Sequence, residues 1–198
     1  QSTPLTVIDA APAWRRLMIC IGIGTVGSIG MWSFVVALPS VQESFGVSRG
    51  AASFPYTMTM LGFAFGGVLM GKLADRYGIV VPLMLGGLLL GTGYTAAGLA
   101  PNLTLFAFAQ LIVGLGTSAS FAPLMVDISR WFDKRRGIAV AVAGSGNYVA
   151  GMIWPPVMQY FIASEGWRPV HFAVGVVCVA VLVPAALLLR QRPPDEAN

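Results

Sequence analysis

Six long apolar segments constrain the fold of this chain more than any other feature of its sequence. Each has about the length of roughly 20 apolar residues that a helix needs to cross the hydrocarbon core of a bilayer. Only 10% of the 198 residues are charged, whereas a soluble globular domain contains about 25%. The sequence therefore predicts an integral membrane protein. Its predicted spans cover approximately residues 17–38, 52–71, 80–100, 103–127, 137–162 and 168–190.

The predicted spans are helices rather than barrel strands. Lipid offers the backbone no hydrogen-bond partner, so a spanning segment must be a helix or part of a closed barrel. The segments are too long for barrel strands and lack their alternation of apolar and polar residues. We therefore predict an all-α fold of six transmembrane helices, and we expect no catalytic residue, metal ion or cofactor. Cys20 and Cys178 lie inside apolar runs, where free cysteine acts as a small apolar side chain.

The basic residues predict how the chain is oriented. With six spans, the two tails and the second and fourth links lie on one side of the membrane. Cytoplasmic loops are enriched in Lys and Arg, and only Arg49 and Arg168 fall on the other side. We therefore place both termini in the cytoplasm, with residues 1–16 and 191–198 as tails. The ten basic residues of the predicted cytoplasmic side are Arg15, Arg16, Lys72, Arg76, Arg130, Lys134, Arg135, Arg136, Arg190 and Arg192.

The net charge of +4 is spread along that side instead of forming one patch. It is thus a topology signal, and nucleic acid is not an expected partner. We expect a multi-pass protein of the cell inner (plasma) membrane, surrounded by lipid.

Two motifs resemble a known family. Residues 71–78, "GKLADRYG", resemble the G-x-L-x-D-R-x-G loop between helices two and three of the major facilitator superfamily. Residues 130–156, "RWFDKRRGIAVAVAGSGNYVAGMIWPP", followed by "EGWRP", resemble the fourth loop and fifth helix of its monocarboxylate carriers and oxalate/formate exchangers. Residues 32–50, "WSFVVALPSVQESFGVSRG", are similar to the first helix end and outer loop of bacterial members. The resemblance covers nearly the whole chain.

The resemblance implies the N-terminal half of a transporter that has twelve spans in two halves. This half would consist of two three-helix repeats of inverted topology, and residues 191–198 would link it to a second half, either a C-terminal half or a second copy. The implied activity is secondary transport of a small organic anion such as a monocarboxylate, by alternating access, with a proton or by exchange. The first helix lacks the embedded lysine of some carriers, so a charge that binds an anion would come from the other half.

The resemblance also assigns a conformational role to the charged loops. Gly71, Asp75, Arg76 and Gly78 match the loop motif, and we expect Asp127 and Arg130 to pair with Arg76 and Asp75. Breaking one partner of a partly buried pair is costly, which suits a contact made in one state only. Our hypothesis is that these pairs stabilise the outward-open state; the alternative is that they only mark a turn. Basic residues are missing after Gly78, and Arg135 and Arg136 would supply them from the next loop.

Polar side chains inside the spans indicate which helices line a path, because such residues usually face a cavity or the bundle interior. The third and sixth predicted helices are the least polar and should face lipid, whereas the other four should line the path. Close helix packing is the alternative explanation for several of these residues, with Asn147 bonding between helices and aromatic rings filling the core. The path candidates are Ser28, Trp32, Tyr56, Gln110, Ser118, Asn147 and Tyr148.

Three other functions compete with anion transport. A rhomboid-like protease would need Ser145 and His171 in contact, but the topology places them at heights that differ by roughly 13 Å at 1.5 Å per residue, so the chain is not expected to be an enzyme. His171 is instead expected to be structural, at the outer membrane interface. Drug or other solute/proton antiport is disfavoured because the fifth helix lacks a Gly-Pro-x-x-Gly-Gly run. A non-transporting subunit that binds a membrane partner stays open.

Overall fold

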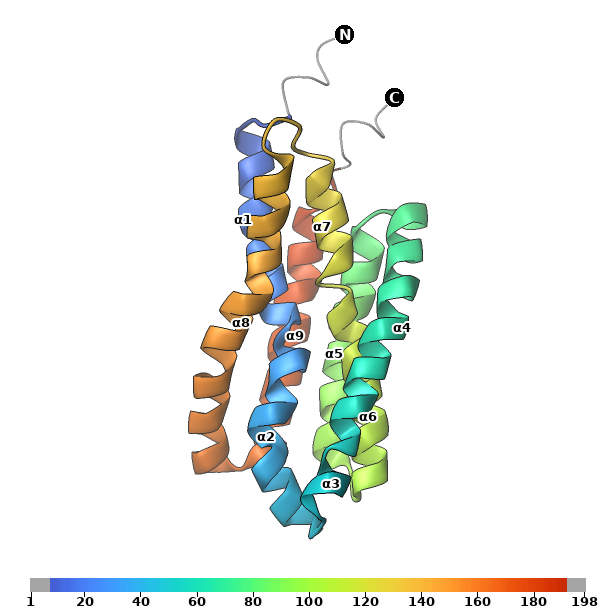
Figure 1. The fold of residues 1–198 in the computed structure, drawn as a ribbon, viewed down its shortest axis with the longest axis vertical. Coiled ribbons are helices and arrows are strands. Elements are labelled where there is room, and N and C mark those ends of the chain that lie inside the picture. Colours follow the sequence, from blue (N-terminus) through green and yellow to red (C-terminus); the bar gives the residue numbers. More distant parts are fainter. Residues whose placement is uncertain (1–7, 192–198) are drawn as a thin grey trace.

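The computed structural model describes residues 8–191, so residues 1–7 and 192–198 of the two predicted tails lie outside the described part. Every regular element in residues 8–191 is a helix. Six helical stretches are long and apolar enough to cross a membrane, which confirms the predicted fold class (Figure 1). We number these stretches as spans 1 to 6: Ala11–Phe45, Arg49–Tyr77, Val80–Leu99, Leu103–Ser129, Arg136–Glu165 and Trp167–Leu188.

Three spans consist of more than one helix. Span 1 contains α1 (Ala11–Gly27) and α2 (Ile29–Phe45), separated at Ser28. Span 2 contains the short α3 (Arg49–Ala52) and α4 (Phe54–Tyr77). Span 4 contains α6 (Leu103–Ser118) and α7 (Ala122–Ser129), separated by a tight turn. Spans 3, 5 and 6 are α5 (Val80–Leu99), α8 (Arg136–Glu165) and α9 (Trp167–Leu188).

Several helices extend beyond the predicted spans. Span 1 runs from residue 11 to residue 45, whereas the apolar run predicted 17–38. Hydropathy marks the part of a helix that is dissolved in lipid, but the hydrogen-bonded backbone continues into polar flanks until a residue stops it. Gly46 and Gly78 end α2 and α4 with φ of +61° and +79°, a conformation that glycine adopts at little cost.

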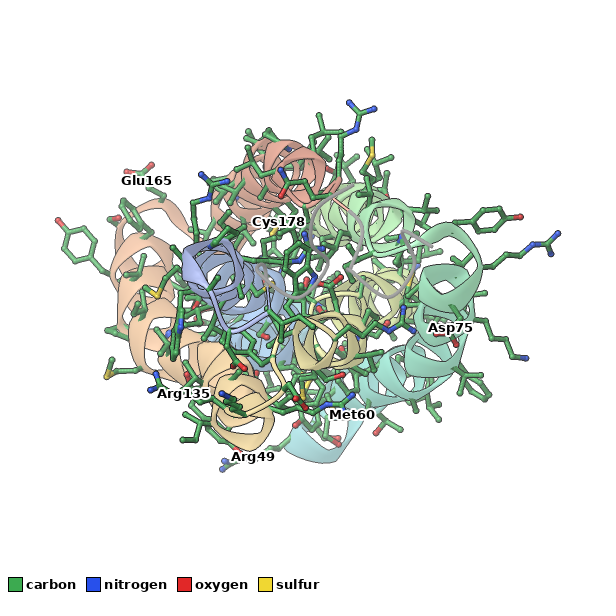
Figure 2. All side chains as sticks on the ribbon, turned by 90° about the horizontal axis from the view of Figure 1, so that it is seen from above. Arg49, Met60, Asp75, Arg135, Glu165 and Cys178 are labelled. Atoms are coloured by element: carbon green, nitrogen blue, oxygen red, sulfur yellow. The ribbon has the colours of Figure 1, made fainter. Side chains whose placement is uncertain are left out.

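The packing of the spans repeats within the bundle. Span 1 packs on span 5 as span 4 packs on span 2, and spans 3 and 6 pack on each other. This pattern is unchanged when spans 1–3 exchange places with spans 4–6, as the predicted pair of repeats requires. Seen from above, α4 and α8 lie at opposite sides of the bundle (Figure 2). They are also the most open helices: only 22% of the apolar window of span 2, and 22% of that of span 5, is buried.

Candidate functional site

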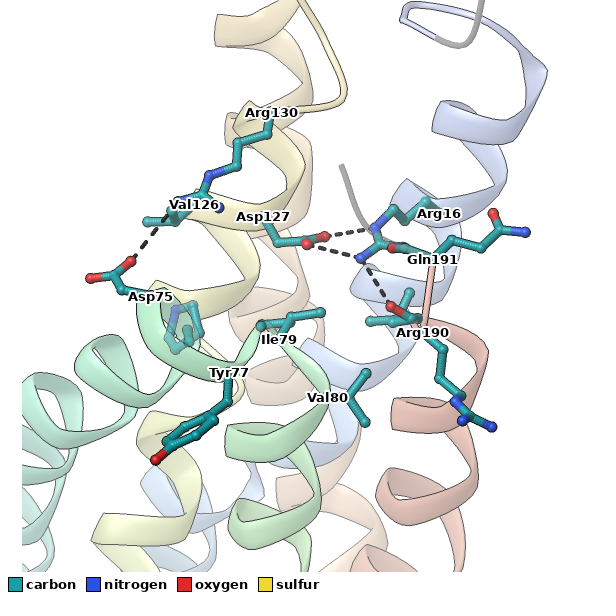
Figure 3. A pocket seen from close by; sticks show the side chains of 14 residues that line it. Arg16, Asp75, Tyr77, Ile79, Val80, Val126, Asp127, Arg130, Arg190 and Gln191 are labelled. Atoms are coloured by element: carbon teal, nitrogen blue, oxygen red, sulfur yellow. Dashed lines mark hydrogen bonds and ion pairs between the residues drawn. The ribbon is translucent and has the colours of Figure 1, made fainter. Parts of the chain in front are cut away.

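One end of the bundle carries most of the charged residues, and we call it the basic end. It contains the start of α1, the ends of α4, α7 and α9, and the loop of residues 130–135 (Figure 1). A pocket of about 200 Å³ opens there. Figure 3 shows its wall, on which α1, α4, α7 and the end of α9 meet. Its charged lining residues are Arg16, Asp75, Asp127, Arg130 and Arg190.

A buried ion pair joins α1 to α7 in this pocket. The Arg16 Nε donates to Oδ2 of Asp127 at 2.7 Å, and one terminal nitrogen of Arg16 donates to Oδ1 at 2.8 Å. The two side chains are 5% and 6% exposed. This fork geometry is the strongest arrangement of an arginine and a carboxylate. The same guanidinium lies 4.6 Å from the ring centroid of Trp131.

The predicted partner of Asp127 was wrong. We expected Arg76, but Arg76 is exposed and its guanidinium lies over the ring of its neighbour Tyr77, at 5.3 Å from the centroid. Arg16 occupies the place at Asp127 instead. In the sequence, Arg16 looks like one more basic residue before the first apolar run, because its partner lies 111 residues away.

The second ion pair of the pocket joins the two residues that the sequence paired. One terminal nitrogen of Arg130 lies 3.9 Å from Oδ1 of Asp75, and their side chains are 32% and 71% exposed (Figure 3). Solvent-exposed pairs of this kind contribute about 0–1 kcal/mol. The two pairs at the basic end therefore differ greatly in how easily they can open.

Of the motif glycines, Gly78 has a positive φ, whereas a Cβ added at Gly71 would have no neighbour within 4 Å among residues 8–191.

The loop before α8 is fastened to the start of α1. Trp131 and Phe132 are both buried, and the Phe132 ring meets the Trp14 ring edge-on with centroids 5.2 Å apart. The carboxylate of Asp9 accepts a hydrogen bond from the backbone N–H of Lys134 at 3.0 Å. These contacts explain why Trp131 and Phe132 are aromatic: both rings pack inside the basic end.

The two basic residues after this loop point outward. Arg135 and Arg136 are exposed, and Arg136 makes a long bond of 3.4 Å to Oγ of Ser129. They stand at the start of α8, where the helix dipole disfavours positive charge. Stabilising α8 is therefore not a reason for their presence.

Three of the path candidates lie inside helix contacts. Ser28, Gln110 and Ser118 are 2%, 0% and 1% exposed. The Thr59 hydroxyl donates to Oε1 of Gln110 at 3.3 Å, which joins α4 to α6. The Gln110 Nε2 is buried and has no hydrogen-bond partner among residues 8–191. Ser118 donates to its own helix, to the carbonyl of Leu115 at 2.7 Å.

The other four candidates lie nearer the surface. The Trp32 ring of α2 packs against Gly151 of α8, at 2.6 Å from where a Cβ would stand. Trp32 Nε1 and Asn147 Oδ1 are buried without a hydrogen-bond partner in the described part of the chain. Tyr148 is 75% exposed, and the half-exposed Tyr56 stacks on the Phe34 ring with centroids 6.1 Å apart. The candidates therefore do not form one cluster.

The side chain of His171 faces the interior of the bundle and not lipid. Its side chain is fully buried, with ring centroids of Tyr94, Phe106 and Trp167 within 6 Å. The Nδ1 lies 2.8 Å from the carbonyl of Trp167, which can only accept, so Nδ1 carries the hydrogen. Sequence hydropathy placed α9 against lipid as a whole and gave no sign of which face His171 occupies.

No group of three or more His, Cys, Asp and Glu residues that could hold a metal ion occurs among residues 8–191. Ser145 donates to the carbonyl of Val142 at 2.6 Å, within its own helix, and His171 also bonds within its helix. The arrangement offers no nucleophile paired with a base. The described part of the chain has a charged end, neutral polar groups between its helices, and two largely uncovered helices, α4 and α8.

Comparison with known proteins places the chain in a family. The chain is 31% identical to human monocarboxylate transporter 7 over 157 residues, which are 79% of this chain and 30% of that protein. It is 27% identical to human monocarboxylate transporter 11 over 207 residues, covering 97% of this chain and 44% of the relative. It is 30% identical over 131 residues to the MFS-type transporter pynF of Aspergillus niger, covering 66% of this chain and 30% of the relative.

The chain thus spans less than half the length of these relatives. All three are named as transporters and none as an enzyme. Residues 19–198 match the sequence profile of the Major Facilitator Superfamily. With six apolar helices and a profile match over nearly its whole length, this chain is a multi-pass membrane protein that belongs to the Major Facilitator Superfamily.

Proposed function

We propose that this chain is the N-terminal half of a secondary transporter that moves a small organic anion, such as a monocarboxylate, by alternating access. The substrate class is supported by the names of the relatives, several of which are monocarboxylate transporters. The transport would be coupled to a proton or would proceed by exchange. Since the described charged residues lie near the ends of the spans, the positive charge that attracts the anion comes from the second half.

The observation that carries the proposal is the openness of α4 and α8. Both helices expose aromatic and polar groups, including Tyr56 on α4 and Tyr148 on α8. Polar groups that face lipid are costly, so these faces are suited to a cavity or a protein partner. Cβ atoms added at Gly67 and Gly71 of α4 would meet no atom of residues 8–191 within 4 Å, so packing within the described part of the chain does not require glycine there. Close approach of a second six-helix half would require glycine at these two positions.

Neutral hydrogen-bond groups would be the contribution of this half to binding. Trp32 Nε1 and Gln110 Nε2 are donors without partners in residues 8–191, and donors suit a carboxylate. Asn147 adds a buried amide oxygen on α8, the helix whose Gly151 the Trp32 ring contacts. Small side-chain movements between access states would bring these groups to the substrate. Ser28 and Ser118 are also buried and would add hydroxyl groups.

The basic end would be the cytoplasmic gate, with both termini in the cytoplasm of a cell bounded by its inner (plasma) membrane. The exposed Asp75–Arg130 pair is the part of the gate that opens, with Arg76, Arg135 and Arg136 facing the second half. Asp75→Asn should then shift the resting population from outward-open to inward-open. Unchanged reactivity of single cysteines on both sides of the membrane would contradict this.

The test of the proposed function starts with the native mass of the purified chain in mild detergent. Proteoliposomes of whatever assembly is found, with a second chain or a second copy, are then assayed for uptake of labelled lactate, formate and oxalate. Uptake of at least one anion supports the proposal. Uptake of cationic drugs against a proton gradient would instead support antiport, and a stable partner complex without any uptake would support a non-transporting subunit.

A further inference from the structure

We propose that Arg16 is a positioning residue that clamps the end of α9 to α1 and α7 in both access states. The Arg16–Asp127 pair would stay closed while the Asp75–Arg130 pair opens. The sequence places all four residues in one charged region, but the structure divides them into a buried clamp and an exposed latch. That the clamp stays closed during a transport cycle rests on the proposed function; the clamp itself does not.

The geometry shows a single side chain that holds three segments. Besides the two bonds to Asp127, Arg16 donates to the carbonyl of Leu189 at 3.2 Å and to that of Gln191 at 3.0 Å. Leu189 is the C-cap of α9, directly after its last residue Leu188. The last carbonyls of a helix have no partner within the helix, and a cation there is favoured by the helix dipole. Arg16 therefore caps α9 from a different helix.

Burial explains why this contact would be permanent. Arg16 and Asp127 are 5% and 6% exposed, so separating them would leave a carboxylate and a guanidinium buried without partners. Such a separation is far more costly than opening a solvated pair. The 71% exposed Asp75 of the latch, at 3.9 Å from Arg130, loses little when it parts. The Asp75–Arg130 latch is therefore less costly to open than the buried clamp.

The clamp lies at a structurally important point. Leu189 and Gln191 directly follow α9, and in the proposed transporter the chain continues from there to the second half. A displacement of that segment would act on the carbonyls of Leu189 and Gln191 and so, through Arg16, on Asp127 and α7. Arg16 would thus hold the segment that follows α9 at a fixed position relative to span 4.

Two native cysteines provide a test that needs no transport. Cys20 lies one turn after Arg16 in α1, Cys178 lies in α9, and both are 0% exposed. A membrane-permeant maleimide is applied to the purified chain in detergent and the rate of labelling is measured. The Cys178→Ala background reports Cys20 alone, and the Cys20→Ala background reports Cys178 as the matched control.

Arg16→Gln should accelerate labelling of Cys20 by roughly 100-fold or more, the factor given by about 3 kcal/mol at about 1.4 kcal/mol per tenfold. Labelling of Cys178 should change much less. Asp75→Asn should leave Cys20 protected. Arg16→Lys should give an intermediate rate, because an ammonium lacks the planar fork that reaches a carboxylate and two carbonyls together.

Three results would overturn the proposal. Equal acceleration at Cys20 and Cys178 would show general unfolding in place of a local clamp. Labelling of Cys20 in Asp75→Asn as fast as in Arg16→Gln would show that latch and clamp are one unit. Full protection in Arg16→Lys would show that the fork is not used. A failure of anion uptake with these labelling results intact would reject the proposed function and leave the clamp standing.

Discussion

Replacing Gly116 by alanine should force two helices apart, because α5 and α6 touch there through their backbones. A Cβ at Gly116 would stand 2.8 Å from the carbonyl oxygen of Gly86 and 2.8 Å from the backbone nitrogen of Leu90. Ordinary van der Waals contact of a Cβ begins at 3.4 Å. The helices must therefore separate locally by about 0.6 Å (3.4 minus 2.8). Neither obstructing atom belongs to a side chain that could rotate away.

The energetic cost can be estimated against a matched control. Overpacking of a well-packed contact costs about 1–3 kcal/mol, while glycine to alanine in a helix gains about 0.5–1 kcal/mol. Gly67→Ala on α4 receives the same helix gain, but its Cβ would meet nothing within 4 Å. Subtracting the two variants isolates the packing cost. Gly67→Ala should be neutral or stabilising, and Gly116→Ala should be less stable than it by about 1–3 kcal/mol.

The assay is thermal unfolding of both variants in the same mild detergent. For a chain of this size, about 1 kcal/mol corresponds to roughly 2–4 °C, so the two midpoints should differ by several degrees. The consequence reaches the site, because α6 carries Gln110 and leads into α7 with Asp127. Equal midpoints for the two variants would refute the reasoning, since they would show that the close approach of α5 and α6 carries no constraint.

Three further predictions follow from buried polar contacts. Ser33→Ala should cost about 1–3 kcal/mol because the buried Tyr94 hydroxyl loses its 2.6 Å partner; Tyr94→Phe in the same chain should restore part of that loss in thermal unfolding. Arg168→Gln should destabilise the end of α5 by about 1–2 kcal/mol, because the half-buried guanidinium donates to two carbonyls there at 2.8 and 2.9 Å. This loss is measured as faster backbone hydrogen exchange at residues 97–100 in Arg168→Gln than in the unchanged protein. Gln110→Met should keep or raise the melting temperature, since it removes a buried amide nitrogen that has no hydrogen-bond partner among residues 8–191, yet lower anion uptake; unchanged uptake would remove Gln110 from the path.

The glycine-rich helix contacts show how far the sequence could lead. The sequence contains 24 glycines, which allow helices to approach closely, and hydropathy located all six spans, because both depend on local chemistry alone. Which glycine faces a neighbouring backbone, as Gly116 does, and which faces open space, as Gly67 does, depends on how the helices are rotated. The breaks at Ser28 and between α6 and α7 were not predicted either, since small residues such as Ser28 and those at 118–120 are tolerated inside a transmembrane helix and gave no signal of a break.

The charged residues divide in the same way between sequence and tertiary structure. The six-helix membrane fold, the basic end and the pairing of Asp75 with Arg130 could be predicted from the sequence, the pairing because two loops must meet on one side of the membrane. That Asp127 binds Arg16 and that His171 points inward is visible only in the folded chain. Loop position is set by the order of the spans, whereas burial of one side chain is set by contacts between helices distant in the chain, and no local pattern encodes those contacts.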